Sequence, residues 1–248
     1  MVIKTTFMLD MILLDAAAEP QGGSALMWGV FIVLTVVSMI VSKNVERKFK
    51  KYSKIRTEGG LTGCEVAERM LRDHDIHNVR VQMVKGTLTD HYNPTNRTLN
   101  LSPDVYNGTS VAAAAVAAHE CGHAVQHAVG YAPLNLRSML VPIVSFAGRW
   151  VSWVILAGLL LVKAFPSLLL IGILLFAMTT LFSIITLPVE INASSRALQW
   201  IRQHDITSQA THQYAESALR SAAYTYVMAA VTSLATLAYY VMIYLDRR

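Results

Sequence analysis

The stretch with the clearest capacity for chemistry is "VAAHECGHAVQ", residues 116–126, in which three ionisable side chains interrupt an apolar, alanine-rich run. His119 and His123 are four residues apart, so on a helix their imidazoles lie on one face and can bind the same zinc ion. Glu120 is rotated by one position, close enough to act on a water molecule beside the ion without binding it. This is the H-E-x-x-H arrangement of zinc hydrolases.

A catalytic zinc site has three protein ligands and one position for water, so a third ligand must come from another segment. His127 lies about 12 Å along the helix from His119, too far to share an ion whose ligand bonds are about 2 Å long. We expect His127 to contact the ligands or the substrate, or simply to be exposed. Gln126 and Val129 stand where the longer metzincin pattern has its glycine and third histidine, so that pattern does not apply.

Glu190, in "LPVEINASSRALQW" (residues 187–200), is the best candidate for the third ligand. It follows Pro188 at the end of a long apolar run, where a proline either opens a new helix or kinks a continuing one. Glu216 is the alternative ligand, and Glu190 would then be an ordinary charge at a helix end. Ser194 lies one turn after Glu190 and could hydrogen-bond a ligand imidazole.

The elements that must position these residues can be read from the flanking sequence. Thr62 and Glu65 fit a capping box that opens a helix ending near Asp73. Beyond it we expect a strand over residues 78–84, a second strand over 97–101, a loop over 102–109, and an alanine-rich helix from about Ser110 to Val129 that is terminated by Gly130. These elements predict a small α+β domain around the motif.

The composition indicates a membrane protein. The chain has 248 residues, of which 54% are hydrophobic and 15% charged, and its mean hydropathy is +0.41. About 20 helical residues cross a bilayer, and four apolar runs meet that length: 25–42, 138–162, 165–187 and 222–245. Arg149 interrupts the second run. The first 24 residues do not fit a signal peptide, because Asp10 and Asp15 break their apolar stretch.

Seven basic residues between Lys43 and Arg56 follow the first run directly. Such clusters mark the cytoplasmic side and favour anionic lipid, so a nucleic-acid partner is not expected. The predicted organisation is an extracytoplasmic segment (1–24), a first transmembrane helix (25–42), a cytoplasmic catalytic domain (43–137), the second and third transmembrane helices (138–187), a cytoplasmic helix with the third ligand (188–221), and a fourth transmembrane helix with a tail (222–248).

"HECGHAVQ", followed after two apolar runs by "LPVEINASSRAL", resembles the YugP-like family of membrane zinc metallopeptidases. The chain is more distantly similar to the HtpX-type and CAAX-prenyl-protease gluzincins. The resemblance extends from the first apolar run to about Trp200 and includes "TDHYNPTNRTLNLS". It implies that His119, His123 and Glu190 bind zinc and that Glu120 is the catalytic base. Ser194 departs from the HtpX-type relatives, which carry Asp there.

These observations predict a mainly α-helical integral membrane protein, with about four transmembrane helices and a small cytoplasmic α+β zincin-like catalytic domain. We expect a Zn²⁺-dependent endopeptidase of the bacterial inner or plasma membrane type that acts on polypeptides, with membrane proteins as candidate substrates. Arg196, His127, His204 and Tyr224 are candidates to stabilise the transition-state oxyanion. The alternatives are a non-catalytic scaffold that zinc braces, or a zinc-handling protein; the latter would need ionisable residues other than Arg149 in its spans.

Overall fold

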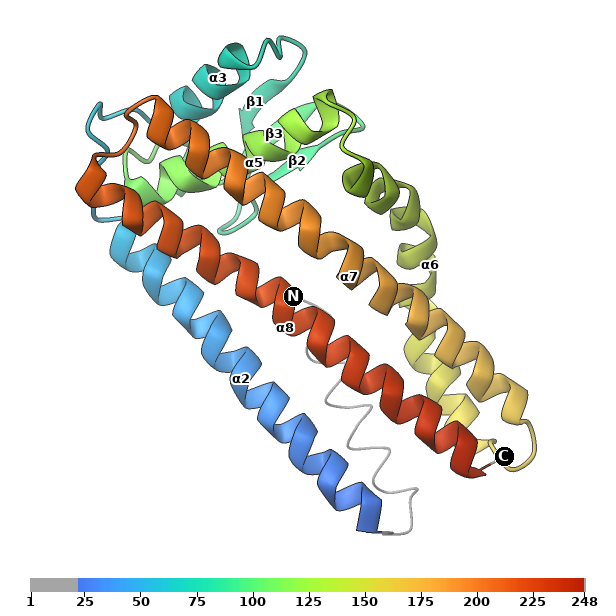
Figure 1. Ribbon diagram of the computed structural model, residues 1–248. Coiled ribbons are helices and arrows are strands. Elements are labelled where there is room, and N and C mark those ends of the chain that lie inside the picture. The colour runs from blue at the N-terminus through green and yellow to red at the C-terminus, as the bar shows by residue number, and fades with distance from the viewer. Residues whose placement is uncertain (1–21, 248) are drawn as a thin grey trace. The chain divides into compact units, whose positions relative to one another are not determined.

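The computed structural model describes residues 22–247, so most of the predicted segment 1–24 lies outside the described residues. The chain forms two compact units. The helical unit holds the described residues up to Ser38, Arg137–Ile185 and those from Val227 on, and the sheet unit holds Met39–Leu136 and Thr186–Tyr226. The elements, in chain order (Figure 1), are α2 (Gly22–Tyr52), α3 (Gly63–Asp73), β1 (Arg80–Met83), β2 (His91–Asn93), β3 (Thr98–Leu101), α4 (Pro103–Tyr106), α5 (Val111–Ala128), α6 (Ala132–Leu160), α7 (Pro166–Gln203) and α8 (Gln209–Arg247).

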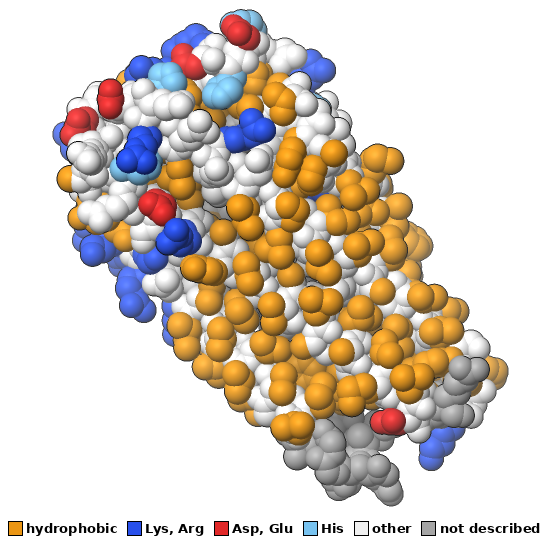
Figure 2. Space-filling view, viewed as in Figure 1, with side chains coloured by type: hydrophobic (Ala, Val, Ile, Leu, Met, Phe, Trp, Pro, Cys, Tyr) orange, Lys and Arg blue, Asp and Glu red, His pale blue; other side chains and the backbone are white. Residues whose placement is uncertain are grey.

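Four of the described helices, α2, α6, α7 and α8, are long and apolar enough to cross a membrane, as predicted from the sequence. Apolar side chains cover the face of the helical unit that Figure 2 shows. The exposed apolar residues of this unit include Val33, Phe146, Trp153 and Leu174. Inside the unit, small residues let two helices approach closely, since a Cβ added to Gly158 would lie 2.6 Å from the Cα of Leu169. An apolar exterior of this extent is typical of a surface in contact with lipid.

The long helices extend beyond the apolar runs of the sequence. α2 continues through the basic cluster to Tyr52, and α7 continues through Pro188 to Gln203. Lys, Arg and Glu are good helix formers, so a helix need not end where its apolar run ends. The predicted helical segment 188–221 is divided between α7 and α8, with the chain turning over residues 204–208, where Asp205 has φ 52°.

The sheet unit contains a three-stranded sheet in the order β1-β3-β2. β1 is parallel to β3 with Arg80 opposite Thr98, and β2 is antiparallel to β3 with His91 opposite Asn100. β1 and β3 occupy the two predicted strand regions. β2 was not predicted, because three residues are too few for a periodic pattern. The predicted loop 102–109 contains the short helix α4, in which Pro103 occupies the first turn.

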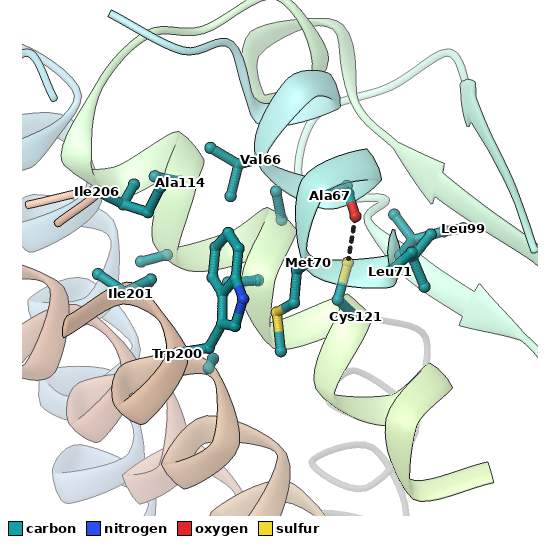
Figure 3. Packing of buried hydrophobic residues seen from close by; sticks show 14 of the residues in the cluster. Val66, Ala67, Met70, Leu71, Leu99, Ala114, Cys121, Trp200, Ile201 and Ile206 are labelled. Atoms are coloured by element: carbon teal, nitrogen blue, oxygen red, sulfur yellow. Dashed lines mark hydrogen bonds between the residues drawn. The ribbon is translucent and has the colours of Figure 1, made fainter. Parts of the chain in front are cut away.

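The core of the sheet unit lies between α3, α5, β3 and the last turns of α7 (Figure 3). α3 starts at the predicted capping box, in which Glu65 N–H donates to Thr62 Oγ1 and Thr62 N–H donates to Glu65 Oε2. The Trp200 indole packs among these apolar side chains, and its Nε1–H donates to Asp73 Oδ2 over 3.0 Å. Packing of α3 and α7 on α5 fixes the helix that carries the H-E-x-x-H motif.

Candidate metal centre

α5 presents both histidines of the motif on one face, as the four-residue spacing predicts. The helix starts at Ser110, whose hydroxyl accepts from Ala113 N–H. The imidazole rings of His119 and His123 meet edge to face with centroids 4.9 Å apart. His123 is buried and His119 is half-buried, so both rings lie in an environment largely protected from water.

Glu190 of α7 completes the group. Its Oε2 lies 3.3 Å from His119 Nε2 and 3.6 Å from His123 Nε2, and the three donor atoms all lie within 4.8 Å of one another. Atoms bound tetrahedrally about 2 Å from one ion lie about 3.3 Å apart. The described side chains therefore fit a zinc ion in both spacing and chemical type, because two imidazoles and one carboxylate are a known zinc-hydrolase ligand set.

A close approach of two helix backbones brings Glu190 to the histidines. Gly122 lies between the two histidines in sequence, and a Cβ built on it would be 2.6 Å from Ala193 O and 3.1 Å from Ala193 Cα. Only glycine permits this separation of α5 and α7. Because α7 continues through Pro188, Glu190 is held within a helix.

Gln126 fixes the orientation of His123. Its fully buried side chain donates from Nε2 to Val189 O (2.8 Å) and to Asn192 Oδ1 (3.0 Å). Both amide protons are thus used, so Gln126 Oε1 must accept from His123 Nδ1–H over 3.0 Å. The Nε2 of His123 is then left without a proton and faces Glu190.

The environment of His123 favours an added positive charge. Burial lowers the pKa of this imidazole, but the hydrogen bond that a protonated Nε2 would donate to Glu190 and the charge of Glu120 raise it, and the net pKa lies above the usual value. The same carboxylates that favour a bound proton would favour a bound cation.

The remaining predicted site residues fall in several places. Ser194 Oγ lies 3.1 Å from His119 Nδ1, which makes it the hydrogen-bond partner of that imidazole. Arg196 donates from Nε to Asn192 Oδ1 (2.8 Å) and so adjoins the Gln126 network. His127 Nδ1 lies 2.7 Å from the Tyr92 hydroxyl. Glu216, the alternative ligand, instead pairs with Arg220 at 3.0 Å on the surface of α8.

Two further candidates for oxyanion stabilisation lie elsewhere. The imidazole of His204 lies 3.2 Å from Asp73 and stacks on Trp200, and Tyr224 is exposed on α8. Neither lines the cavity at the metal centre.

Glu120 is held by the edge strand. Tyr92 N–H of β2 donates to Glu120 Oε2 over 3.0 Å. Glu120, His119, Glu190 and Ser194 all line a cavity of about 180 Å³. The carboxylate of Glu120 and the candidate metal ligands thus share one space. Sequence reasoning missed this contact because it depends on β2.

Cys121 lies on the other side of α5, as its spacing predicts. Its thiol donates to Ala67 O of α3 over 3.5 Å, within the apolar core (Figure 3). Burial raises the pKa of this thiol well above its usual value. A protonated, buried thiol is not a zinc ligand, so Cys121 serves the core.

Two comparisons with known proteins give matches over most of the chain. The sequence model of a family described as "Putative neutral zinc metallopeptidase" matches residues 27–245. The "Putative membrane protease YugP" of Bacillus subtilis (strain 168) is 43% identical to the chain over 222 residues, which cover 88% of this chain and 98% of that protein. No solved structure matches the chain significantly.

Proposed function

Since the chain belongs to the "Putative neutral zinc metallopeptidase" family, we propose that it is a membrane-embedded, zinc-dependent endopeptidase. His119, His123 and Glu190 would hold the zinc ion, and Glu120 would be the general base. The observation that carries the proposal is the convergence of three donor atoms within 4.8 Å beside a carboxylate that lines the same cavity.

Each of these residues has a separate role in the proposed peptide hydrolysis. When bound, zinc would lower the pKa of a water molecule and polarise the scissile carbonyl. Glu120 takes a proton from the attacking water and delivers it to the leaving amine. The Tyr92 N–H holds one Glu120 oxygen and leaves the other to accept that proton. Ser194 and Gln126 fix the two imidazoles through their Nδ1 atoms, so that each Nε2 would be free to bind the zinc ion.

Three protein ligands favour catalysis over a purely structural role. Structural zinc sites are generally closed by four protein ligands, whereas a catalytic site keeps a position for water. Cys121, the nearest thiol in sequence, points into the core. A zinc-braced scaffold is the alternative function, and it would not depend on Glu120.

We also propose that the site faces the cytoplasm. The support is the cluster of seven basic residues between Lys43 and Arg56, which lies at the end of α2 that belongs to the sheet unit. Lys and Arg beside a transmembrane helix are retained on the cytoplasmic side. Substrates would then be cytoplasmic polypeptides or the cytoplasmic parts of membrane proteins.

The test compares the wild type with Glu120→Gln, and with Glu216→Gln as a matched control on an exposed ion pair. Each protein is purified in detergent and loaded with zinc, and both bound zinc and cleavage of unfolded casein are measured. We expect about one zinc per chain in all three proteins, cleavage by the wild type and Glu216→Gln, and none by Glu120→Gln.

The other outcomes separate the parts of the proposal. Unchanged cleavage by Glu120→Gln would refute Glu120 as the base. Zinc binding without cleavage by the wild type would favour the scaffold. Failure of the wild type to bind zinc would refute the ligand assignment.

A further inference from the structure

We infer that the cavity at the metal centre is an apolar subsite, which seats a large uncharged apolar side chain next to the scissile bond and discriminates against acidic residues. The inference rests on the proposed function, since it names the substrate class of the same site. It is drawn from the apolar residues that line the cavity and take no part in the proposed reaction.

Apart from Tyr226, the side chains that two long helices, α2 and α8, contribute to the cavity lining are apolar. α2 contributes Val45 and Phe49, and α8 contributes Leu219, Ala222 and Ala223. All of these residues belong to the sheet unit. The two alanines leave space where larger side chains would fill it, and the cavity volume is about 180 Å³. The proposed catalysis uses only the ligand residues and Glu120, so these apolar side chains are available to select the substrate.

An exposed leucine extends this apolar lining to the rim. Leu88, in the loop between β1 and β2, lines the cavity and is 63% exposed. Its φ of 57° is a left-handed conformation that bulky residues rarely adopt. The loop is held by Asp90, whose Oδ1 accepts from Ser102 N–H over 2.7 Å and from its hydroxyl over 3.0 Å. The structure thus maintains an apolar side chain at the entrance at some conformational cost, which an apolar guest would explain.

The apolar lining sets the discrimination. Asp90, Glu120 and Glu190 also line the cavity, and no Lys or Arg is among its described lining residues. A substrate carboxylate would be desolvated against the apolar side chains without a cationic side chain of the lining to pair with it. A lysine or arginine side chain would lose its water for the same apolar walls. An uncharged apolar side chain avoids both costs.

The experiment uses two peptides that differ only in one central residue, Leu or Asp. Their Kd is measured on the full-length, zinc-loaded Glu120→Gln protein in lipid nanodiscs, and their kcat/KM on the wild type. Apolar pockets discriminate by about tenfold or more per well-placed group. We therefore expect at least about tenfold tighter binding and faster cleavage of the Leu peptide.

Cavity variants assign the preference to these walls. Ala222→Phe should fill the space and reduce the Leu-over-Asp ratio at least about fivefold, by the same scale of pocket discrimination. Phe49→Ala should enlarge it, which should lower the Leu-over-Asp ratio and make a third peptide, with Trp at the central position, a better substrate than the Leu peptide. The control Ala210→Phe changes an exposed residue of α8 that does not line the cavity, and it should leave the ratio unchanged.

Each contrary result is decisive. Cleavage of both peptides at equal rates, or a ratio that Ala222→Phe and Phe49→Ala do not alter, would overturn the subsite and leave the peptidase intact. Equal Kd values would be expected if a lipid chain occupied the cavity, and they too would overturn it. Tighter binding of the Leu peptide without cleavage would support the subsite while refuting the peptidase.

Discussion

Gly122→Ala should weaken zinc binding although Gly122 has no side chain that could bind a metal ion. The added methyl group would sit 2.6 Å from Ala193 O, whereas ordinary contacts begin at 3.4 Å. The neighbouring helix must therefore move by about 0.8 Å, the difference between these two distances. The obstacle is a backbone carbonyl, so no side-chain rotation can relieve it. Glu190 lies three residues before Ala193 on α7 and would move with it.

The effects on stability and on zinc binding should differ in size. Overpacking a tight contact lowers the free energy of unfolding by about 1–3 kcal/mol, whereas replacing glycine by alanine inside a helix raises it by about 1 kcal/mol. The free energy of unfolding should therefore fall by only about 0–2 kcal/mol. Zinc–ligand distances tolerate about 0.2 Å, so a displacement of Glu190 several times larger should lower zinc affinity about 10–100-fold, the range seen when ligand support is lost.

Competition with a chelator gives the zinc Kd, and the rise in Tm on adding zinc gives an independent measure through mass action. Gly148→Ala is the matched control, because this exposed glycine of α6 has nothing within 4 Å of an added Cβ. It should leave zinc binding unchanged. If Gly122→Ala bound zinc as tightly as Gly148→Ala, the close approach of α5 and α7 would not set the ligand geometry, and the reasoning would be refuted.

Two predictions concern the side chains that orient the imidazoles. Ser194→Ala should lower zinc affinity about tenfold, because it leaves His119 Nδ1 without its partner. Ser194→Asp should restore or exceed the wild-type affinity. A zinc Kd from chelator competition that is unchanged in both variants would contradict this role of Ser194. Gln126→Leu should lower both Tm and zinc affinity, since the buried Val189 O and His123 Nδ1 lose a partner and Asn192 Oδ1 loses one of two. Gln126→Glu should lower Tm but keep most of the zinc affinity, because the introduced carboxylate still accepts from His123 Nδ1–H. If Tm and zinc affinity fell together in both Gln126 variants, Gln126 would only stabilise the fold.

The parts of the fold that follow from local sequence rules were predictable. Apolar runs of sufficient length gave the four long helices, and the capping residues Thr62 and Glu65 gave the start of α3. Helix ends that depend on tertiary contacts were not predictable, because Lys, Glu and Arg continue a helix as readily as they end one. The three-residue strand β2 has no periodic signal of its own and exists through its pairing with β3.

In the candidate site, too, features set by spacing along one helix were predictable, and contacts between distant segments were not. The spacing of His119 and His123 on one helix brings their rings together, and Glu190 was selected because it follows an apolar run at a proline. Gln126 appeared in the sequence only as a departure from another zinc-protease pattern. Its contacts with Val189 and Asn192 lie more than sixty residues away in the chain, and spacing along one helix carries no information about them. The Tyr92 contact to Glu120 is hidden for the same reason.

These contacts indicate which segments of the chain the candidate metal centre requires. The histidines and Glu120 lie within the predicted domain 43–137, yet one short segment of α7 supplies the third candidate ligand and contacts that support both imidazoles. Glu190 is the third donor, Ser194 lies against His119, and Val189 and Asn192 hold the glutamine that orients His123. Each imidazole therefore depends on α7 for its orientation as well as for the shared carboxylate. A metal centre of this kind cannot reside in residues 43–137 alone, because the helix that continues from the third apolar run is part of it.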